Sequence, residues 1–395
     1  MKKTLVALAA LAATTAFAQS TVSITGLFDV GYRTEDIKGN KVTTSAASNN
    51  TSTSNLTFSG SEDLGGGLKA AFRYESGPTL SETGAKTAGT SAVGTTSNVT
   101  SYLGNGASWV ELSGGFGSIK LGAPNVATLS ANGDGNSGFG TAIGSGYRVT
   151  SFDAVRFQNS MRYDTPSFNG LSAAYVISGK NDKQSASPAS GNAVNQQYGR
   201  DNVREMSLAY AQGPLTARYV DLQTEQWAST LNSAVAAAGA AVITPTAVRG
   251  NGEKFNLKTI SAKYAVNKDL NVSYFNQKAT SDTLDKPSTT GATPSDLKYD
   301  RKTTGLAAAY TMGANTFMIN RATVTIGDET GAGTDGKKST VTGLGINHAL
   351  SKRTTAYFRN ENTKDLAGVK AITGYSAVNS STSYKATAVG IMHSF

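Results

Sequence analysis

The stretch LKAAFRYESG, residues 68–77, alternates two chemically different sets of side chains. Successive side chains of a β-strand point to opposite sides, so one face would carry Leu68, Ala70, Phe72 and Tyr74. Lys69, Arg73 and Glu75 would share the other face. A helix would mix the two sets. The stretch therefore predicts a strand with one apolar face and one charged face.

The same unit recurs from residue 20 onward: two alternating segments flank a very short turn, and a long polar loop leads to the next unit. A first strand is expected at Thr21–Arg33, followed by a loop rich in Ser, Thr and Asn to about Thr53. The short turns are EDLGGG (62–67), GGFG (114–117), TPSFNG (165–170), AQGP (211–214), NKD (267–269) and SKRT (351–354). The other long loops lie near 78–106, 123–155, 179–201, 225–254, 280–299, 326–339 and 363–381.

About sixteen strands result, an even number joined by short turns at one end and long loops at the other. This pattern is typical of a transmembrane antiparallel β-barrel with short periplasmic turns and long extracellular loops. A soluble β-sandwich also alternates apolar and polar residues, but its loops are not so regularly divided into short and long. In a bilayer the apolar face points to lipid and the polar face lines a lumen, which sixteen strands leave wide and water-filled. A hydrophobic fraction of only 38% fits that inverted arrangement.

The N-terminus predicts export. Lys2 and Lys3 precede a short apolar run, and Ala16-Phe17-Ala18 forms a cleavage site of the small-residue type, so residues 1–18 are interpreted as a signal peptide and residues 19–395 as one barrel domain. The chain has no cysteine and a net charge of +9. Its basic residues are scattered singly rather than clustered, which argues against a nucleic-acid partner.

Six motifs spaced along the chain resemble the Gram-negative general porins of β-proteobacteria and neisseriae. They are TVSITGLFDVGY (21–32), FSGSEDLGGGLKA (58–70), ELSGGFGSIKLG (111–122), NSMRYDTPSFNGL (159–171), ALSKRT (349–354) and GIMHSF (390–395). The resemblance implies a homotrimer of sixteen-stranded barrels. It also implies that the last strand pairs with the first, and that the terminal Phe395 is part of the signal read by the outer-membrane barrel assembly machinery.

In porins the third loop folds into the lumen and narrows it, so the resemblance places the constriction in residues 123–155. This loop offers Asp134, Arg148 and Asp153. Alternation assigns further charges to the inward wall: Arg33, Lys69, Arg73, Glu75, Glu111, Lys120, Arg156, Arg162 and, further round, Arg218. Basic side chains outnumber acidic ones six to two among the first eight of these. A narrow lumen focuses such charge, so we expect a modest preference for anions.

The residues that catalysis or metal binding would need are scarce. The chain has two histidines, His348 and His393, and both fall on the apolar phase near the short-turn end, where we expect them at the membrane interface. NGDGN, residues 132–136, lacks the bidentate Glu of a calcium loop and is interpreted as a flexible turn. We therefore expect no cofactor, no metal site and no enzymatic activity.

The sequence favours a diffusion pore that is surrounded by outer-membrane lipid. Small hydrophilic solutes and inorganic ions would pass through its lumen. Two alternatives remain open at this stage. One is a barrel that acts chiefly as an adhesin or receptor through its long loops. The other is a substrate-selective channel, which saturable solute flux would distinguish from simple diffusion.

Overall fold

The computed structural model describes residues 21–37, 40–77, 106–136, 138–140, 142–146, 156–179, 200–227, 254–281, 299–327, 336–364 and 383–395. These residues are almost entirely β-strand, with one helix, α2 (Ala127–Gly135). The strands are β1 (Thr21–Ile37), β2 (Asn40–Ser48), β3 (Asn55–Gly65), β4 (Leu68–Ser76), β5 (Ser108–Gly114), β6 (Gly117–Ala123), β7 (Ser160–Asp164), β8 (Leu171–Ser178), β9 (Arg200–Gln212), β10 (Leu215–Trp227), β11 (Lys254–Ala265), β12 (Leu270–Ser281), β13 (Tyr299–Met312), β14 (Asn315–Ile326), β15 (Lys338–Ala349), β16 (Thr354–Lys364) and β17 (Ser383–Ser394).

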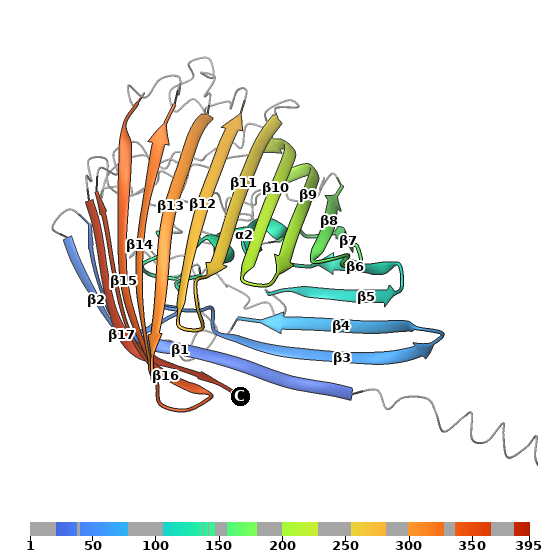
Figure 1. Cartoon of the computed structure of the whole chain (residues 1–395), viewed down its shortest axis with the longest axis horizontal. Coiled ribbons are helices and arrows are strands. Elements are labelled where there is room, and N and C mark those ends of the chain that lie inside the picture. The colour runs from blue at the N-terminus through green and yellow to red at the C-terminus, as the bar shows by residue number, and fades with distance from the viewer. Residues whose placement is uncertain are drawn as a thin grey trace, which may run out of the picture.

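All described strands belong to one antiparallel sheet, which closes because β1 pairs with β17. On its other side β1 pairs with two strands placed end to end: β3 along residues 21–27 and β2 along residues 30–37. These two strands therefore share one position in the ring, and the 17-stranded sheet is a barrel of sixteen strand positions (Figure 1). The predicted barrel and the predicted closure of the last strand on the first are confirmed.

Short turns join neighbouring strands at one end of the barrel, where the sequence placed them. Two residues separate β3 from β4, β5 from β6, β9 from β10 and β13 from β14. Gly213 and Gly313 have φ values of 59° and 60°, a left-handed conformation that glycine adopts without the steric cost of a Cβ. The predicted loops at 78–106, 179–201, 225–254, 280–299, 326–339 and 363–381 lie largely outside the described residues.

The first predicted loop differs from the structure. β1 continues to Ile37, and β2 occupies residues 40–48 inside the segment predicted as loop to Thr53. The sequence KVTTSAAS is polar and therefore looks like a loop. Its Val and Thr residues nevertheless favour strand, and pairing with the extended β1 satisfies its backbone.

The outward face of the barrel is apolar, as the alternation predicts. Val22, Val110 and Leu306 are 67%, 62% and 63% exposed, which suits side chains that face lipid. They alternate along their strands with inward residues such as Glu111, as LKAAFRYESG predicts. Apolar side chains therefore cover the outside of the barrel and charged side chains point into it, as expected in a bilayer.

Helix α2 lies inside the ring, where it contacts β9 to β13 (Figure 1). It belongs to the third loop, so the inward fold of that loop is confirmed. The interpretation of NGDGN as a turn is wrong, because residues 132–135 form the second half of α2. Gly and Asn are poor helix formers in isolation, and contacts with the barrel wall override that preference here. No helix in the described part of the chain is long and apolar enough to cross a membrane.

Part of the wall behind the loop is apolar on its inner face as well. Val176, Val203, Leu222 and Leu257 point inward and are buried in one cluster with Val126 of the loop. Further along the loop, Phe139 packs against Ala309 and Met318. This part of the lumen is a packed core rather than a water-lined wall, so the open channel lies against the remaining strands.

Candidate functional site

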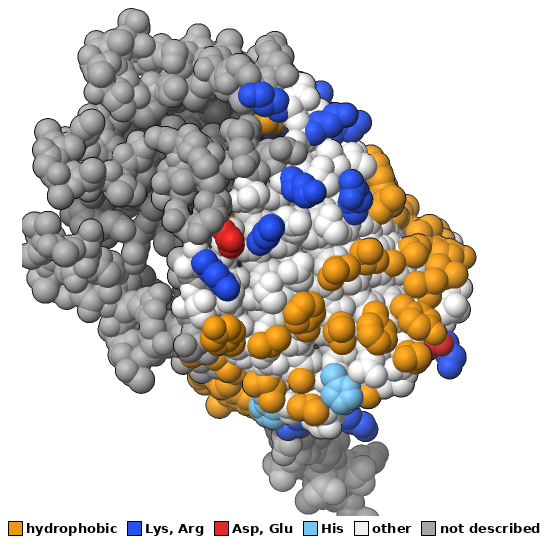
Figure 2. Space-filling model, turned by 90° about the vertical axis from the view of Figure 1, so that its left-hand side faces the viewer, with side chains coloured by type: hydrophobic (Ala, Val, Ile, Leu, Met, Phe, Trp, Pro, Cys, Tyr) orange, Lys and Arg blue, Asp and Glu red, His pale blue; other side chains and the backbone are white. Residues whose placement is uncertain are grey.

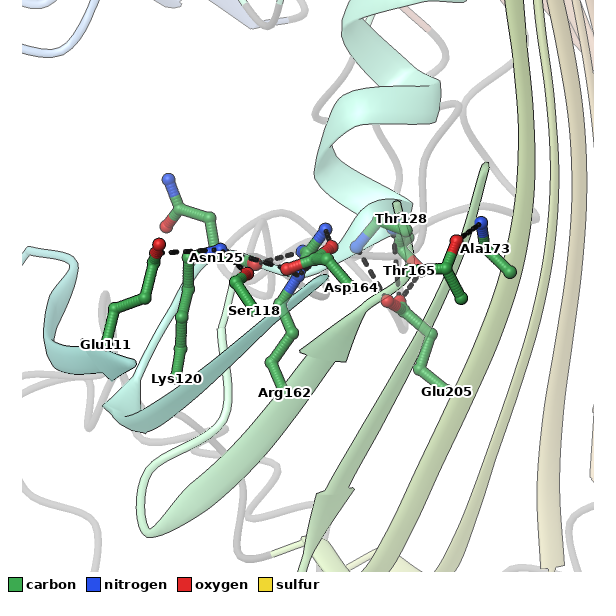
Figure 3. Close-up of polar contacts among 11 residues, drawn as sticks. Glu111, Ser118, Lys120, Asn125, Thr128, Arg162, Asp164, Thr165, Ala173 and Glu205 are labelled. Carbon is green, nitrogen blue, oxygen red and sulfur yellow. Dashed lines mark hydrogen bonds and ion pairs between the residues drawn. The ribbon is translucent and has the colours of Figure 1, made fainter. Parts of the chain in front are cut away.

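The N-terminus of α2 is held by a side chain of the barrel wall. The Glu205 carboxylate of β9 accepts hydrogen bonds from the backbone N–H of Ala127 (2.6 Å), from that of Thr128 (3.1 Å) and from the Thr128 hydroxyl (2.6 Å). The preceding residue, Val126, provides no side-chain cap. Glu205 therefore satisfies the free N–H groups of the first turn and places a negative charge at the positive end of the helix dipole (Figure 3).

The side and the C-terminus of α2 have their own contacts with the wall. Asp134 forms an ion pair with Arg218 of β10, with 3.2 Å between the carboxylate and Nε. The Ser273 hydroxyl of β12 donates to the Gly135 carbonyl at 2.9 Å. Asp134 and Arg218, both predicted as pore charges, thus lie together and neutralise each other between the helix and the wall.

The second half of the loop is fixed further round the barrel, on β14 to β16. The Glu361 carboxylate of β16 accepts from the backbone N–H groups of Gly144 (2.8 Å) and Gly146 (3.2 Å). The Asn320 amide of β14 donates to the carbonyls of Gly144 (3.0 Å) and Ser145 (2.8 Å). The loop backbone also lies directly against Gly343 of β15, where any Cβ would collide with it. Attachment at α2 and again at residues 144–146 keeps the described part of the loop inside the ring.

A buried network beside β1 ties a second inner segment, residues 49–54, to the same loop. Asp29 accepts hydrogen bonds from the Tyr357 hydroxyl (2.6 Å) and from Thr51. The side-chain amide of Asn50 donates to the same Tyr357 hydroxyl (2.9 Å), and the backbone carbonyl of Asn50 accepts from the Ile143 N–H (3.1 Å). The third loop therefore packs against residues 49–54, through the hydrogen bond between Ile143 and Asn50.

The wall on β5 to β7, next to β8, presents a continuous row of charges to the lumen. Lys120 lies between two acids, 3.2 Å from Glu111 and 2.9 Å from Asp164. Arg162 pairs with the same Asp164 at 2.6 Å and donates to the Asn125 carbonyl at the start of the loop (2.6 Å). Figure 3 shows this row running from Glu111 toward α2.

Two more ion pairs continue the charged wall on β1 and β4. Arg33 lies 3.3 Å from Glu35, and Arg73 lies 2.7 Å from Glu75. The Arg73 side chain is 38% exposed and its Glu75 partner only 13%. In this pair the cation, rather than the acid, faces the water of the lumen.

These pairs change the charge balance that the sequence indicated. Five of the predicted basic residues, Arg33, Arg73, Lys120, Arg162 and Arg218, have an acidic partner within 3.3 Å. Two of the partners, Glu35 and Asp164, were not among the predicted pore residues. Each lies two positions after a predicted arginine and so on the same face of its strand, a signal that the alternation already contained.

The other predicted pore residues are dispersed. Lys69 lies at the short-turn end of β4 and is exposed. Arg156 forms a backbone bridge with Asn125 where the chain leaves the loop. Arg148 and Asp153 lie outside the described residues. The sequence predicted no role in the pore for the anchoring residues Glu205, Glu361 and Asn320, because only tertiary contacts reveal their partners.

The residues expected at the membrane interface are on the outer face. His348 and His393 are exposed, and their ring nitrogens lie 2.8 Å from the Asn315 amide oxygen and 2.9 Å from the Thr354 hydroxyl. Phe395 exchanges two backbone hydrogen bonds with Gly26 (3.0 and 3.1 Å), and its ring lies 5.3 Å from that of Phe28. Their roles at the interface and in assembly remain predictions.

The chain is similar to a known protein family over most of its length. The family described as Gram-negative porin matches residues 4–368. Outer membrane porin protein 32 of Delftia acidovorans is 35% identical over 234 residues, which cover 55% of this chain and 58% of that protein. Major outer membrane protein P.IB of Neisseria lactamica is 32% identical over 182 residues, which cover 44% and 49%. The chain thus matches about half the length of each of these relatives.

Solved structures share the architecture over nearly the whole chain. An anion-selective porin from Comamonas acidovorans has a TM-score of 0.67 at 24% identity and covers 95% of this chain and 100% of its own. OmpT of Vibrio cholerae, folded in vitro and in a trimer form, has a TM-score of 0.62 at 11% identity and covers 96% and 100%. At these identities the likeness establishes the fold.

Proposed function

Because the chain belongs to the Gram-negative porin family, we propose that it forms a water-filled diffusion channel in the outer membrane. Small hydrophilic solutes and inorganic ions pass through it without a cofactor or an energy source. Family and fold point to a channel rather than an enzyme, and we extend this to the absence of any catalytic activity. Export by cleavage after Ala18 is part of the same proposal.

One observation carries the proposal: a loop anchored at both ends inside a closed barrel, facing a wall of charged side chains. The loop fills the lumen beside β8 to β16, where clusters of apolar inward residues lie beside the polar anchors Glu205, Asn320 and Glu361. The wall of β1 and β4 to β7 is left with Arg33, Arg73, Lys120 and Arg162 and their acids. A hydrated ion crossing here meets alternating charges, an arrangement suited to passage rather than retention.

We further propose a weak preference for anions. Five of the predicted lumen cations are paired with acids, so the field along the wall is smaller than the six-to-two ratio of the sequence indicated. Arg73 still contributes positive charge to the lumen, because its side chain is 38% exposed while that of its partner Glu75 is only 13% exposed. The solved neighbour described as anion-selective supports the same sign.

Recordings in planar bilayers test both parts. In a KCl gradient the reversal potential should have the sign of an anion preference, and current should rise linearly with concentration. A cation preference would refute the selectivity. Saturable flux of one solute would refute general diffusion and identify a substrate-selective channel. A homotrimer, proposed because one solved neighbour is described in a trimer form, should close in three equal steps.

A further inference from the structure

The outer face of the barrel carries lysines in register on neighbouring strands. Lys258 of β11 lies directly opposite Lys278 of β12, which lies opposite Lys302 of β13. Lys302 is opposite Thr325 of β14, and Thr325 is opposite Lys338 of β15. All four lysines are exposed and share the outward phase of their strands. We call Lys258, Lys278, Lys302 and Lys338 the lysine row.

Like charges directly opposite each other destabilise a sheet, so the row needs compensation from outside it. Asp221 lies 3.8 Å from Lys258, and Asp300 lies 3.9 Å from Lys278. Lys258 and Lys278 remain 59% and 57% exposed. Within the described strands, Lys302 and Lys338 form no ion pair. The row therefore keeps a surplus of positive charge at the surface.

A hollow of about 430 Å³ opens in the middle of the row. It is lined by Asn276, Lys278, Asp300, Lys302, Thr325 and Gly327, from β12 to β14 and the residue after β14. The Asn276 amide is engaged with the Thr304 hydroxyl at 3.0 Å. The donors left to face a ligand are the ammonium groups of Lys278 and Lys302, the hydroxyl of Thr325 and the second N–H of the Asn276 amide. Two ammonium groups and a hydroxyl suit a phosphate group, whereas the Asp300 carboxylate in the same hollow weakens its attraction.

The lysine row borders the apolar belt of the barrel. Ile260 lies two residues from Lys258 on the same face, and Leu306 lies four residues from Lys302. At about 3.3 Å per residue, the Cα atoms of these lysines lie roughly 7–13 Å along the strand from those of residues that face lipid. Figure 2 shows Lys and Arg side chains gathered on one side of a band of apolar side chains, with the histidines on the other side. A ligand that fits both surfaces has phosphate groups joined to apolar chains.

We propose that the lysine row and its hollow bind the phosphate groups of an anionic lipid in the outer leaflet, whose acyl chains lie along the apolar belt. The assignment to the outer leaflet rests on the proposed function, because the row lies at the end of the strands that carries the long loops. The structure thus assigns the outer wall a ligand of its own, separate from the lumen.

Binding of purified diphosphorylated lipid A to the folded full-length barrel, measured by native mass spectrometry in detergent, tests the site. Lys278→Gln together with Lys302→Gln should weaken binding about 30-fold, since each lysine near an anionic lipid surface contributes about fivefold. Asp300→Asn should strengthen binding. Lys278→Arg with Lys302→Arg should retain it.

The matched control removes the same charge at the short-turn end. Lys268→Gln with Lys352→Gln should bind lipid A as the unchanged protein does, and all variants should keep the heat-modifiable mobility of a folded barrel. Dephosphorylated lipid A should bind to the unchanged protein as weakly as lipid A binds to the double Gln variant. Equal binding of both lipids, or an equal loss in the control, would overturn the proposal.

Two further arms separate the sources of the signal. Excess inorganic phosphate, compared with KCl at equal ionic strength, should leave lipid A bound. If phosphate displaced lipid A, the hollow would be a site for free phosphate, and the proposed lipid site would be refuted. Conductance on the same preparations separates this site from the proposed channel. If the barrel conducts but binds lipid A and dephosphorylated lipid A equally, only the lipid site is refuted. If it binds lipid A but does not conduct, only the channel is refuted.

Discussion

Replacement of Glu205 by alanine tests whether the wall of the barrel holds the third loop in place. The carboxylate is 1% exposed and accepts three hydrogen bonds from the first turn of α2. Alanine removes all three acceptors and the charge at the N-terminus of the helix. The backbone N–H groups of Ala127 and Thr128 then lose their partner in the wall.

The size of the effect follows from those three contacts. A hydrogen bond to a charged group contributes about 1.5–3 kcal/mol, so the lower value gives about 4.5 kcal/mol for the three bonds. Water that enters the vacated space replaces part of this. We therefore expect the attachment of α2 to weaken by about 2–4 kcal/mol, which multiplies the population of the detached helix about 30- to 900-fold.

Single-channel recording detects this change directly. Glu205→Ala should show increased open-channel noise and more frequent subconductance steps, because the detached helix moves through the path of the ions. Glu361→Ala, which frees the other end of the loop, should have a similar effect. Glu62→Gln, an exposed acid at a short turn, serves as the control. If Glu205→Ala kept the quiet current of the unchanged protein while remaining folded, Glu205 would not be the anchor.

Three further predictions concern the lumen wall and the seam of the barrel. Arg73→Ala should reduce the anion preference and Glu75→Gln should increase it, measured as reversal potentials; a shift of the same sign in both would contradict the charge argument. Asp164→Asn leaves Lys120 and Arg162 without their shared acid and should raise the anion preference further, with an unchanged potential counting against it. Gly390→Ala should lower the unfolding temperature, at a cost of about 1–3 kcal/mol, because a Cβ there meets the Val30 carbonyl of β1 and the Tyr357 hydroxyl; Gly115→Ala, which points into open space, should have no effect.

The alternation of residues was sufficient for the barrel itself. In LKAAFRYESG the period of two determined both the strand and which side chains face lipid, because each depends only on the local geometry of an extended backbone. The i, i+2 ion pairs, such as Arg73 with Glu75, were equally predictable from that period. The row from Glu111 through Lys120 to Asp164 was harder, since it depends on the register of three strands.

Segments without a clear period were the ones that sequence reasoning misassigned. Residues 40–48 are polar and became β2 because the extended β1 offered them a partner. NGDGN has poor helix formers and became part of α2 because Glu205, 77 and 78 positions away from Thr128 and Ala127, binds its first turn. In both cases a distant partner outweighed local preference.

The sequence by itself therefore determined a closed barrel with an apolar outside and a polar inside, since those properties repeat every two residues. Only the tertiary structure decided where the third loop rests, which cations have acidic partners, and which lysines meet on the outer wall. These features depend on contacts between residues far apart in the chain. Their energies are set by distance and burial, which strand periodicity alone does not contain.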